Sequence, residues 1–348
     1  MTDGSVHSRS EYVSRSGRHW QLFAPTVAQV RRGTHNIVRE RSGSRGLAVQ
    51  ATSMTDILHA FISDEMVHII VDHTNEEVYS LWNQQHPDKL RTFVPTNRTE
   101  IWALIGLMIL RGVYGGYRES VTELWSSPVG RAVFSATMSR NRFHTLLRLL
   151  RFDDKKTRTT RQASDNFVAI RQLFDMFNDN CRDSYCLSAN VTIDETLRKF
   201  RGHCKFRVYM PQKSGKYGLL FCVLGDARKR YVSRMLPYTG EAAEGDTERQ
   251  SPTSIVMYLS QHILGSGRNI TINRYYTNVA MVEDLVLNHN LTVVGTINTN
   301  RQHVPDEMKT VAGREVLSSK FAWSGPVKMV SYALHSEYHM SRDWTILY

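Results

Sequence analysis

The sequence has little cysteine, no long apolar run and, over one basic stretch, no acidic residue. Its four cysteines, at 181, 186, 204 and 222, are too few and too irregularly spaced for a disulfide framework or for the paired ligands of a structural zinc site. The longest apolar run, residues 101–110, covers about half of the ~20 residues that a membrane helix needs, and residues 1–10 lack the apolar centre of a secretory signal. We therefore expect reduced thiols, no membrane segment and a cytosolic or nuclear protein.

Basic residues outnumber acidic ones. The 348 residues include 44 Lys and Arg against 33 Asp and Glu, which gives a formal net charge of +11. Because the excess is clustered, it favours a polyanionic partner such as nucleic acid; a soluble protein that is merely basic is the alternative. The length suggests two domains or one large interrupted domain.

The first half of the chain reads as a basic arm followed by helices. Residues 1–50 hold eight arginines against three acids, with repeated Ser and Gly, which predicts a mostly disordered arm. Residues 51–188 follow helical periods and predict about five helices, with caps at Ser63, Asn97 and Ser139. In the clearest helix, 140–151, the apolar positions Phe143, Leu146, Leu147 and Leu150 lie on one face, and the arginines take other angles.

The second half reads as strands and helices. Short β-prone runs cover 189–200, 217–224, 231–236, 269–273 and 291–297, with helices at 252–264 and 277–289. This order predicts a mixed sheet with helices packed on it. Residues 301–348 are irregular or β, with strands at 321–323 and 327–332 and an apolar last run that needs a partner strand. The predicted fold class is α+β or α/β.

One carboxylate stands at the start of a basic track. Asp194 lies within an apolar β-prone run, and seven Lys or Arg follow between positions 198 and 216 with no acid among them. Metal-assisted chemistry on a phosphate backbone needs this combination, because the acid can hold a divalent cation while the basic groups neutralise phosphates. Glu195 alternates to the opposite face of the strand, so we expect only one of the pair to join such a site. An ordinary strand edge with two solvated acids fits these residues equally well.

A second carboxylate is missing where one is expected. A two-metal site needs three or more carboxylates, yet the run 269–273 ends on the amide Asn273. An amide offers a metal one neutral oxygen and no charge. Glu283 and Asp284 lie more than two turns along the following helix and are not expected to replace the missing acid.

The residues around Asp194 resemble the block that contains the first catalytic aspartate of piggyBac transposases. The similarity extends through ordered blocks from about residue 33 to the C-terminus: 36–38, 55–75, 138–143, 149–155, 192–218, 237–240, 269–271, 294–296, 325–326 and 330–332. The resemblance implies a helical dimerisation and DNA-binding module over 51–188 and an RNase H-like core over 189–300. It also implies the start of a truncated insertion domain over 301–348.

The same resemblance implies three catalytic aspartates that bind Mg²⁺, cut-and-paste transposition at TTAA targets and a C-terminal zinc domain. Asp194 matches the first aspartate, and Asn273 stands in place of the second. The third belongs beyond the position matched by Leu347, so we expect the RNase H-like core to be incomplete, the zinc domain to be absent and Mg²⁺ binding to be weak or lost.

The resulting hypothesis is a nuclear, homodimeric, piggyBac-derived DNA-binding protein that does not transpose alone. The candidate DNA contacts are Arg198, Lys199, Arg201, Lys205, Arg207, Lys213 and Lys216. Four tyrosines, at 209, 217, 275 and 276, could stack on bases, although strand aromatics more often lie in a core. Two alternatives remain: a fragment of an active Mg²⁺-dependent transposase, and a domesticated dimerising protein that no longer binds DNA.

Overall fold

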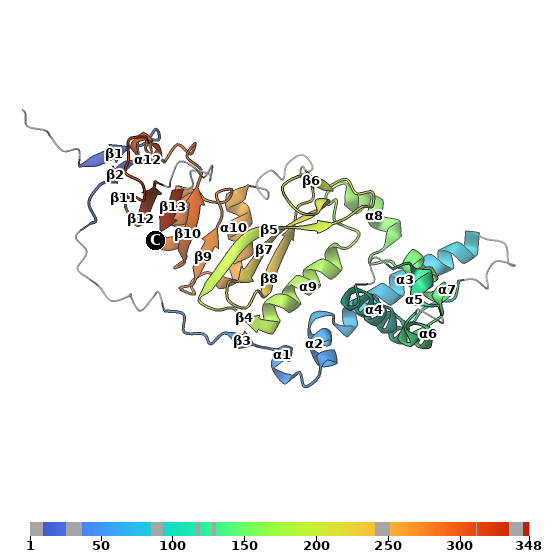
Figure 1. Cartoon of the computed structure of the whole chain (residues 1–348). Helices are drawn as coiled ribbons and strands as arrows, with labels where there is room; N and C mark the ends of the chain where they lie inside the picture. The colour runs from blue at the N-terminus through green and yellow to red at the C-terminus, as the bar shows by residue number, and fades with distance from the viewer. Residues whose placement is uncertain are drawn as a thin grey trace, which may run out of the picture. The chain divides into compact units, whose positions relative to one another are not determined.

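The chain folds into two compact units. The computed structural model describes residues 10–25, 37–84, 93–115, 119–126, 130–240, 251–310, 312–333 and 344–347 (Figure 1). One unit is helical and covers residues 47–180, and the other combines residues 1–46 with residues 181–348. The helical unit therefore ends before residue 188, the boundary expected from the sequence.

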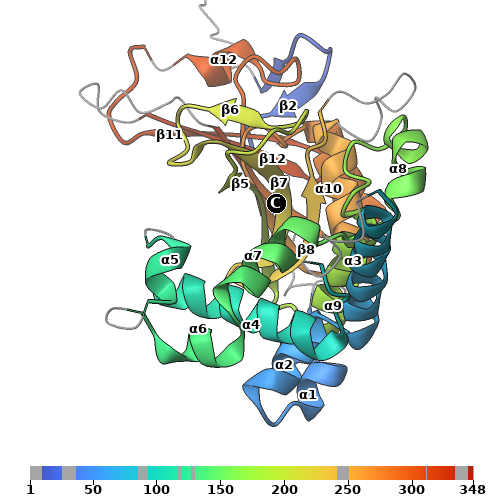
Figure 2. The same cartoon turned by 90° about the vertical axis from the view of Figure 1, so that its right-hand side faces the viewer.

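The helical unit contains more helices than the five expected, because several are only one or two turns long. Those in its described residues are α1 (Leu47–Gln50), α2 (Met54–Phe61), α3 (Asp64–Gln84), α4 (Arg98–Val113), α5 (Val121–Leu124), α6 (Ala132–Thr137), α7 (Arg140–Leu149), α8 (Lys155–Gln162) and α9 (Arg171–Ser184), which runs on into the second unit. Helices α4 to α7 lie close together (Figure 2), and their apolar side chains share one core cluster with α3 and α9.

Side-chain caps stabilise the starts of α4 and α7, as expected. The hydroxyl of Ser139 accepts a hydrogen bond from the Arg142 amide at the start of α7, and the side chain of Asn97 accepts one from the Glu100 amide at the start of α4. Within α7 the buried set differs from the expected one, because Leu149 is buried and Leu147 is 39% exposed. The helix thus faces its core at a slightly different angle.

The second unit is built on one large mixed sheet. Its strands are β1 (Glu11–Val13), β2 (His19–Gln21), β5 (Asn190–Lys199), β6 (Val208–Met210), β7 (Lys216–Asp226), β8 (Val232–Pro237), β9 (Asn269–Ile272), β10 (Thr292–Ile297), β11 (Ser319–Ser324), β12 (Val327–Tyr332) and β13 (Trp344–Leu347). A separate two-stranded sheet pairs β3 (Gly43–Ser44) with β4 (Tyr185–Cys186). The helices are α10 (Pro252–Ser260), the 3₁₀ turn η4 (Gln261–Ile263), α11 (Val279–Leu287) and α12 (Asp306–Lys309).

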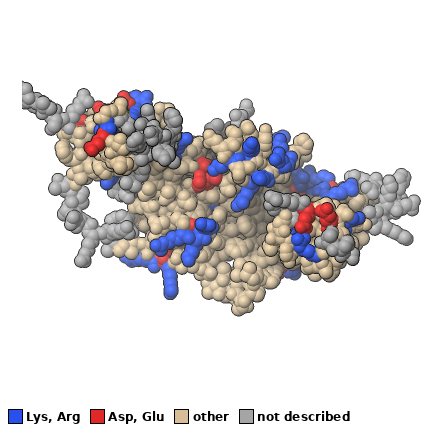
Figure 3. Space-filling model, viewed as in Figure 1, with Lys and Arg blue, Asp and Glu red and all other residues tan. Residues whose placement is uncertain are grey.

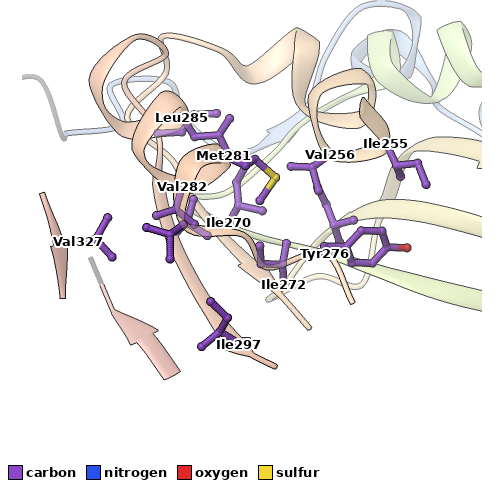
Figure 4. Close-up of a cluster of buried hydrophobic side chains, with 14 of the residues drawn as sticks. Ile255, Val256, Ile270, Ile272, Tyr276, Met281, Val282, Leu285, Ile297 and Val327 are labelled. Atoms are coloured by element: carbon purple, nitrogen blue, oxygen red, sulfur yellow. The ribbon is translucent and has the colours of Figure 1, made fainter. Parts of the chain in front are cut away.

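Five adjacent strands have the arrangement expected of an RNase H-like core. They lie in the order β8-β7-β5-β9-β10, with β7 antiparallel to β5 and β8, and with β9 and β10 parallel to β5 (Figure 1). Helices α10 and α11 pack on this sheet through a single apolar cluster that includes Val256, Ile270, Val282 and Leu285 (Figure 4). The expected strands and helices of residues 189–300 are therefore present, with ends that shift by a few residues.

The described part of the N-terminal arm contains two short paired strands that were not predicted from the sequence. Strands β1 and β2 form a hairpin, and β2 continues the sheet beside β11. Trp20 is fully buried in the main apolar cluster, and its indole Nε1 donates to the carbonyl of His303 at 3.0 Å. A large aromatic side chain that is buried with its polar atom satisfied offsets the entropy of ordering a short arm.

The last strands extend the same sheet. Strand β13 lies between β12 and β10 and is antiparallel to both, so the apolar run at 344–347 has two partner strands. Strands β11 and β12 pair with each other and connect the sheet to the β1–β2 hairpin. Residues 301–348 thus belong to the same compact unit as the strands of 189–300.

Candidate active site and nucleic-acid interface

Asp194 and Asn273 lie side by side at the centre of the sheet. Strands β5 and β9 run parallel, with Ile193 opposite Ile272. The residues that follow them, Asp194 and Asn273, are therefore neighbours across the two strands. The amide nitrogen Nδ2 of Asn273 donates to Asp194 Oδ1 at 3.0 Å. The structure therefore brings together the two residues that the sequence resemblance assigned to the first and second aspartate positions.

The orientation of the Asn273 amide follows from its other hydrogen bonds. Its Oδ1 accepts from the backbone N–H of Tyr275 at 2.9 Å, which leaves Nδ2 to face the carboxylates. The Asn273 carbonyl in turn accepts from the Thr277 hydroxyl at 2.8 Å and from the Thr277 amide at 3.2 Å. This turn fixes the amide as a donor toward the site.

Glu195 also takes part in the site, contrary to expectation. Asn273 Nδ2 donates to Glu195 Oε2 at 3.2 Å, although Asp194 and Glu195 alternate along β5. Asn273 follows the last residue of β9, and from this position beyond the paired strand it reaches both carboxylates. The alternation of side chains along β5 could not predict this contact, because Asn273 lies beyond the paired residues of β9.

Glu195 belongs to a partly buried polar cluster beneath the site. It lies opposite Cys222 in the β5–β7 register, and the fully buried Tyr276 donates its hydroxyl hydrogen bond to Cys222 Sγ at 3.2 Å. In Figure 4 the hydroxyl of Tyr276 points away from Met281 and Leu285. Burial raises the pKa of the Glu195 carboxyl, and the neighbouring Asp194 carboxylate raises it further, whereas the Tyr276 hydroxyl opposes this.

These residues do not fit a pair of divalent cations. Two carboxylates face the site, and an N–H₂ group that donates to both of them stands where a third ligand would accept a metal. Within the residues that the structure describes, no group of three or more Cys, His, Asp or Glu side chains is placed to hold a metal ion. The Asn273 amide instead donates to one oxygen of each carboxylate.

Glu283 and Asp284 are engaged elsewhere, as the sequence suggested. The guanidinium of Arg18 donates to both oxygens of Glu283, with Nη1 at 2.8 Å from Oε2. Arg18 Nε also donates to the hydroxyl of Ser324, so this ion pair ties the N-terminal hairpin to α11 and β11. Asp284 Oδ1 accepts from the amide nitrogen of Asn288 at 2.7 Å.

The seven candidate DNA contacts line one end of β5, the loop after it and the β6–β7 hairpin, and we call this segment, residues 198–216, the basic loop. All are exposed except the half-buried Lys213, whose Nζ donates to the carbonyl of Glu195 at 3.3 Å. Lys and Arg atoms gather over β6 and the adjoining strand ends on the face seen in Figure 3. The loop is held by its own contacts, since Arg207 donates to the carbonyls of Arg201 and Gly202.

The tyrosines divide into buried and exposed. Tyr276, in the turn after β9, is buried in the core, but Tyr209, Tyr217 and Tyr275 are 56%, 40% and 51% exposed. Among the arginines of α7, Arg142 pairs with Glu100 at 2.5 Å. Arg151, just after α7, pairs with Glu77 at 2.8 Å.

The four cysteines are unpaired, and Cys181 and Cys222 are buried. No helix in the described ranges has the length and hydropathy required to cross a membrane.

The chain is similar to known proteins over most of its length. The family profile described as Transposase IS4 matches residues 53–341. Two human proteins are 23% identical to the chain over 235 residues, or 66% of its length: PiggyBac transposable element-derived protein 3, of which 37% is covered, and the chimeric ERCC6-PGBD3 protein, of which 21% is covered. The match thus spans less than two fifths of the length of either relative.

A solved structure supports the same assignment. The chain resembles the piggyBac transposase in a cryo-EM structure of its synaptic complex with hairpin DNA, with a TM-score of 0.81 and 31% identity over 88% of this chain and 63% of that one. This match confirms the mixed α/β fold with an RNase H-like core. The family profile covers most of the chain, and the relatives and the solved structure agree with it. The chain therefore belongs to the piggyBac-type transposase family.

Proposed function

We propose that this piggyBac transposase-derived protein binds DNA and does not carry out cut-and-paste cleavage. The observation that carries the proposal is the amide of Asn273, which donates to both Asp194 and Glu195 beside an exposed basic loop. The chain spans 63% of the solved transposase, so its activity does not follow from the match alone.

The loss of cleavage follows from charge. In the family, Mg²⁺ stabilises the negative charge that develops on the phosphate, and it requires carboxylates that converge on it. Here the second ligand position holds a donor in place of an acceptor, and Glu195 is partly buried with a raised pKa, which disfavours its charged form. The residues present do not fit the metal.

DNA binding is independent of this loss. Neutralising phosphates releases counterions, and this contribution depends on Lys and Arg and not on the acids of the active site. No acidic residue occurs between positions 196 and 225, a stretch that includes the whole basic loop and most of β7. The similar transposase was solved in a complex with hairpin DNA, which supports DNA as the partner. A DNA partner also supports a nuclear location.

A homodimer through the helical unit completes the proposal. Helix α4 exposes Ile109 and Val113 by 46% and 73%, and these two residues lie one helical turn apart on one face; the adjacent Met108 is 39% exposed. A second copy would cover this apolar face. Light scattering should give the mass of a dimer, and Ile109→Asp together with Val113→Asp should shift it toward the monomer.

Cleavage is tested with a TTAA-flanked transposon end in the presence of Mg²⁺. We expect no nicking by the unaltered chain, with a piggyBac transposase as the active control on the same DNA. Asn273→Asp measures how much one carboxylate restores, and Asp194→Ala identifies nicking by contaminants. Nicking by the unaltered chain that Asp194→Ala abolishes would overturn the proposal that cleavage is lost.

DNA binding is tested by gel shift on random duplex across a salt series. Arg198→Ala with Lys199→Ala should weaken binding and reduce the slope of log K against log salt by about 0.9 for each phosphate contact removed. The matched control is Arg228→Ala with Lys229→Ala, which removes two exposed charges from the β7–β8 turn. No binding at low salt, or equal effects of the two pairs, would contradict the proposed interface.

A further inference from the structure

Two exposed tyrosines form a stacked pair at the edge of the sheet. Tyr209 on β6 lies directly opposite Tyr217 on β7, and their ring centroids are 4.6 Å apart with an angle of 29° between the planes. Strand β6 is the last strand in the described sheet order, so no described strand covers it. We call Tyr209, Tyr217 and the neighbouring Arg207 the tyrosine platform.

The surrounding residues hold the tyrosine platform in a fixed shape. The Arg207 guanidinium lies 5.7 Å from the centre of the Tyr217 ring and is anchored by the carbonyls of Arg201 and Gly202 at 3.3 and 3.2 Å. Gly202 allows the close approach of Phe200, because a Cβ at this position would lie 2.7 Å from the phenyl ring. An aromatic surface that is already ordered loses little entropy when a planar ligand stacks on it.

The tyrosine platform shares a sheet face with Asp194. Asp194 pairs with Val223 across β5 and β7, and Tyr217 lies six residues before Val223 on the same strand, an even number that keeps both side chains on one face. At about 3.3 Å per residue the separation along the strand is roughly 20 Å, or about six base-pair steps of ~3.4 Å. Arg198, opposite Leu219, lies between them on the same face. One DNA strand can therefore contact the platform, the basic loop and the remnant site together.

A solvent-exposed tyrosine pair at a sheet edge can also serve only to stabilise the hairpin. Two features indicate that the tyrosine platform also binds a ligand. Tyr209 remains 56% exposed although it is stacked, so much of its surface is open to a ligand. The platform also lies within the acid-free stretch 196–225, where the charge favours a polyanion over a peptide.

We propose that the tyrosine platform stacks an unpaired base of bound DNA, so that the protein prefers DNA with a locally open strand over an intact duplex. In a closed duplex the bases stack on one another and present no open ring face, whereas an unpaired base can stack on Tyr209. This inference rests on the proposed DNA binding and adds the class of DNA that is preferred.

The test compares three oligonucleotides of one sequence and length: a duplex, a duplex with a central mismatched bubble, and a single strand. Fluorescence anisotropy should show tighter binding to the bubble and the single strand than to the duplex. Tyr209→Ala should weaken binding to the bubble at least about fivefold, the lower end for base–aromatic stacking, and should leave the duplex within about twofold. Tyr209→Phe, which keeps the ring, should behave as the wild type.

A direct readout and a matched control separate stacking from other effects. A 2-aminopurine placed in the bubble should be quenched by the wild type and by Tyr209→Phe, but not by Tyr209→Ala. The control is Tyr258→Ala, since Tyr258 is 38% exposed under the Arg234 guanidinium and lies on α10, outside the platform.

Equal affinity of the wild type for bubble and duplex would overturn the stacking proposal while leaving DNA binding intact. Equal loss on both DNAs in Tyr209→Ala would also overturn it. Absence of binding to all three oligonucleotides would refute the proposed function as well.

Discussion

Replacing Asn273 by aspartate should destabilise the protein without metal and make its stability respond to a divalent cation. The amide nitrogen lies 3.0 Å from Asp194 Oδ1 and 3.2 Å from Glu195 Oε2. A carboxylate oxygen at the same place removes two hydrogen bonds to acidic groups, worth roughly 1.5–3 kcal/mol each, and adds repulsion of about 4 kcal/mol per charge pair at ~4 Å and an effective dielectric of ~20.

Solvent reduces the full sum, because Asp194 is exposed and a proton can neutralise one carboxyl. We expect a net loss of about 2–3 kcal/mol at neutral pH, which corresponds to a decrease in Tm of roughly 4–12 °C in a unit of this size. Thermal unfolding in EDTA measures this decrease. Adding Mg²⁺ should restore most of the Tm of Asn273→Asp and leave the wild type unchanged, because only the variant presents three carboxyl groups to a cation.

A control variant distinguishes this from the general effect of a new negative charge. Asn288 donates its amide nitrogen to Asp284 Oδ1 at 2.7 Å, so Asn288→Asp loses a similar hydrogen bond but creates only one pair of carboxylates. It should melt slightly below the wild type and show no response to Mg²⁺. The reasoning is refuted if Asn273→Asp melts at the wild-type temperature in EDTA, or if Mg²⁺ shifts both variants equally.

Three further changes test the sheet unit. Burial raises the pKa of Glu195, so the folded protein loses stability as pH rises through that pKa and the carboxyl ionises. In urea titrations Glu195→Gln should therefore be more stable than the wild type at neutral pH. This difference should disappear below about pH 4.3, where the carboxyl is protonated in both the folded and the unfolded state. Burial acts to raise the pKa of Asp226, but hydrogen bonds from three backbone N–H groups outweigh it and lower this pKa. Asp226→Asn should therefore cost about 2 kcal/mol of unfolding free energy at neutral pH and progressively less as pH falls below about 3.9. A cost that does not change with pH would contradict this. Trp20→Ala should cost about 3–5 kcal/mol of unfolding free energy, whereas Phe23→Ala, at a 69% exposed position, should cost little.

Local patterns predicted most of the core, because its strands and helices are long enough to show their period. Strand β5 was expected at 189–200 and covers Asn190–Lys199, and the strand expected at 269–273 ends one residue before Asn273. The short strands β1 and β2 have three residues each, which is too few for alternation to be visible. The hairpin that they form is held in place by Trp20, which contacts residues far away in the sequence, such as His303.

The site was predictable in part, because the resemblance to piggyBac transposases singled out Asp194 and Asn273. The parallel pairing of β5 with β9, which places the two residues side by side, was found only in the structure. The contact of Asn273 with Glu195 depends on the turn after β9, where the Tyr275 amide orients the side chain. Glu195 contacts Tyr276, in the turn after β9, and lies opposite Cys222 on β7. No local pattern in the sequence connects these three residues.

The Asn273 amide explains how the remnant site can stay folded without a cation. Carboxylates that converge on a site repel one another, and in an intact metal site the cation compensates this charge. In this chain the hydrogens of one amide group contact both carboxylates, and the same side chain is fixed by the Tyr275 N–H. An amide at this position therefore donates hydrogen bonds to both carboxylates, where a third carboxylate would repel them. The basic loop and the tyrosine platform derive their binding energy from phosphates and bases, so the proposed DNA binding can persist after cleavage is lost.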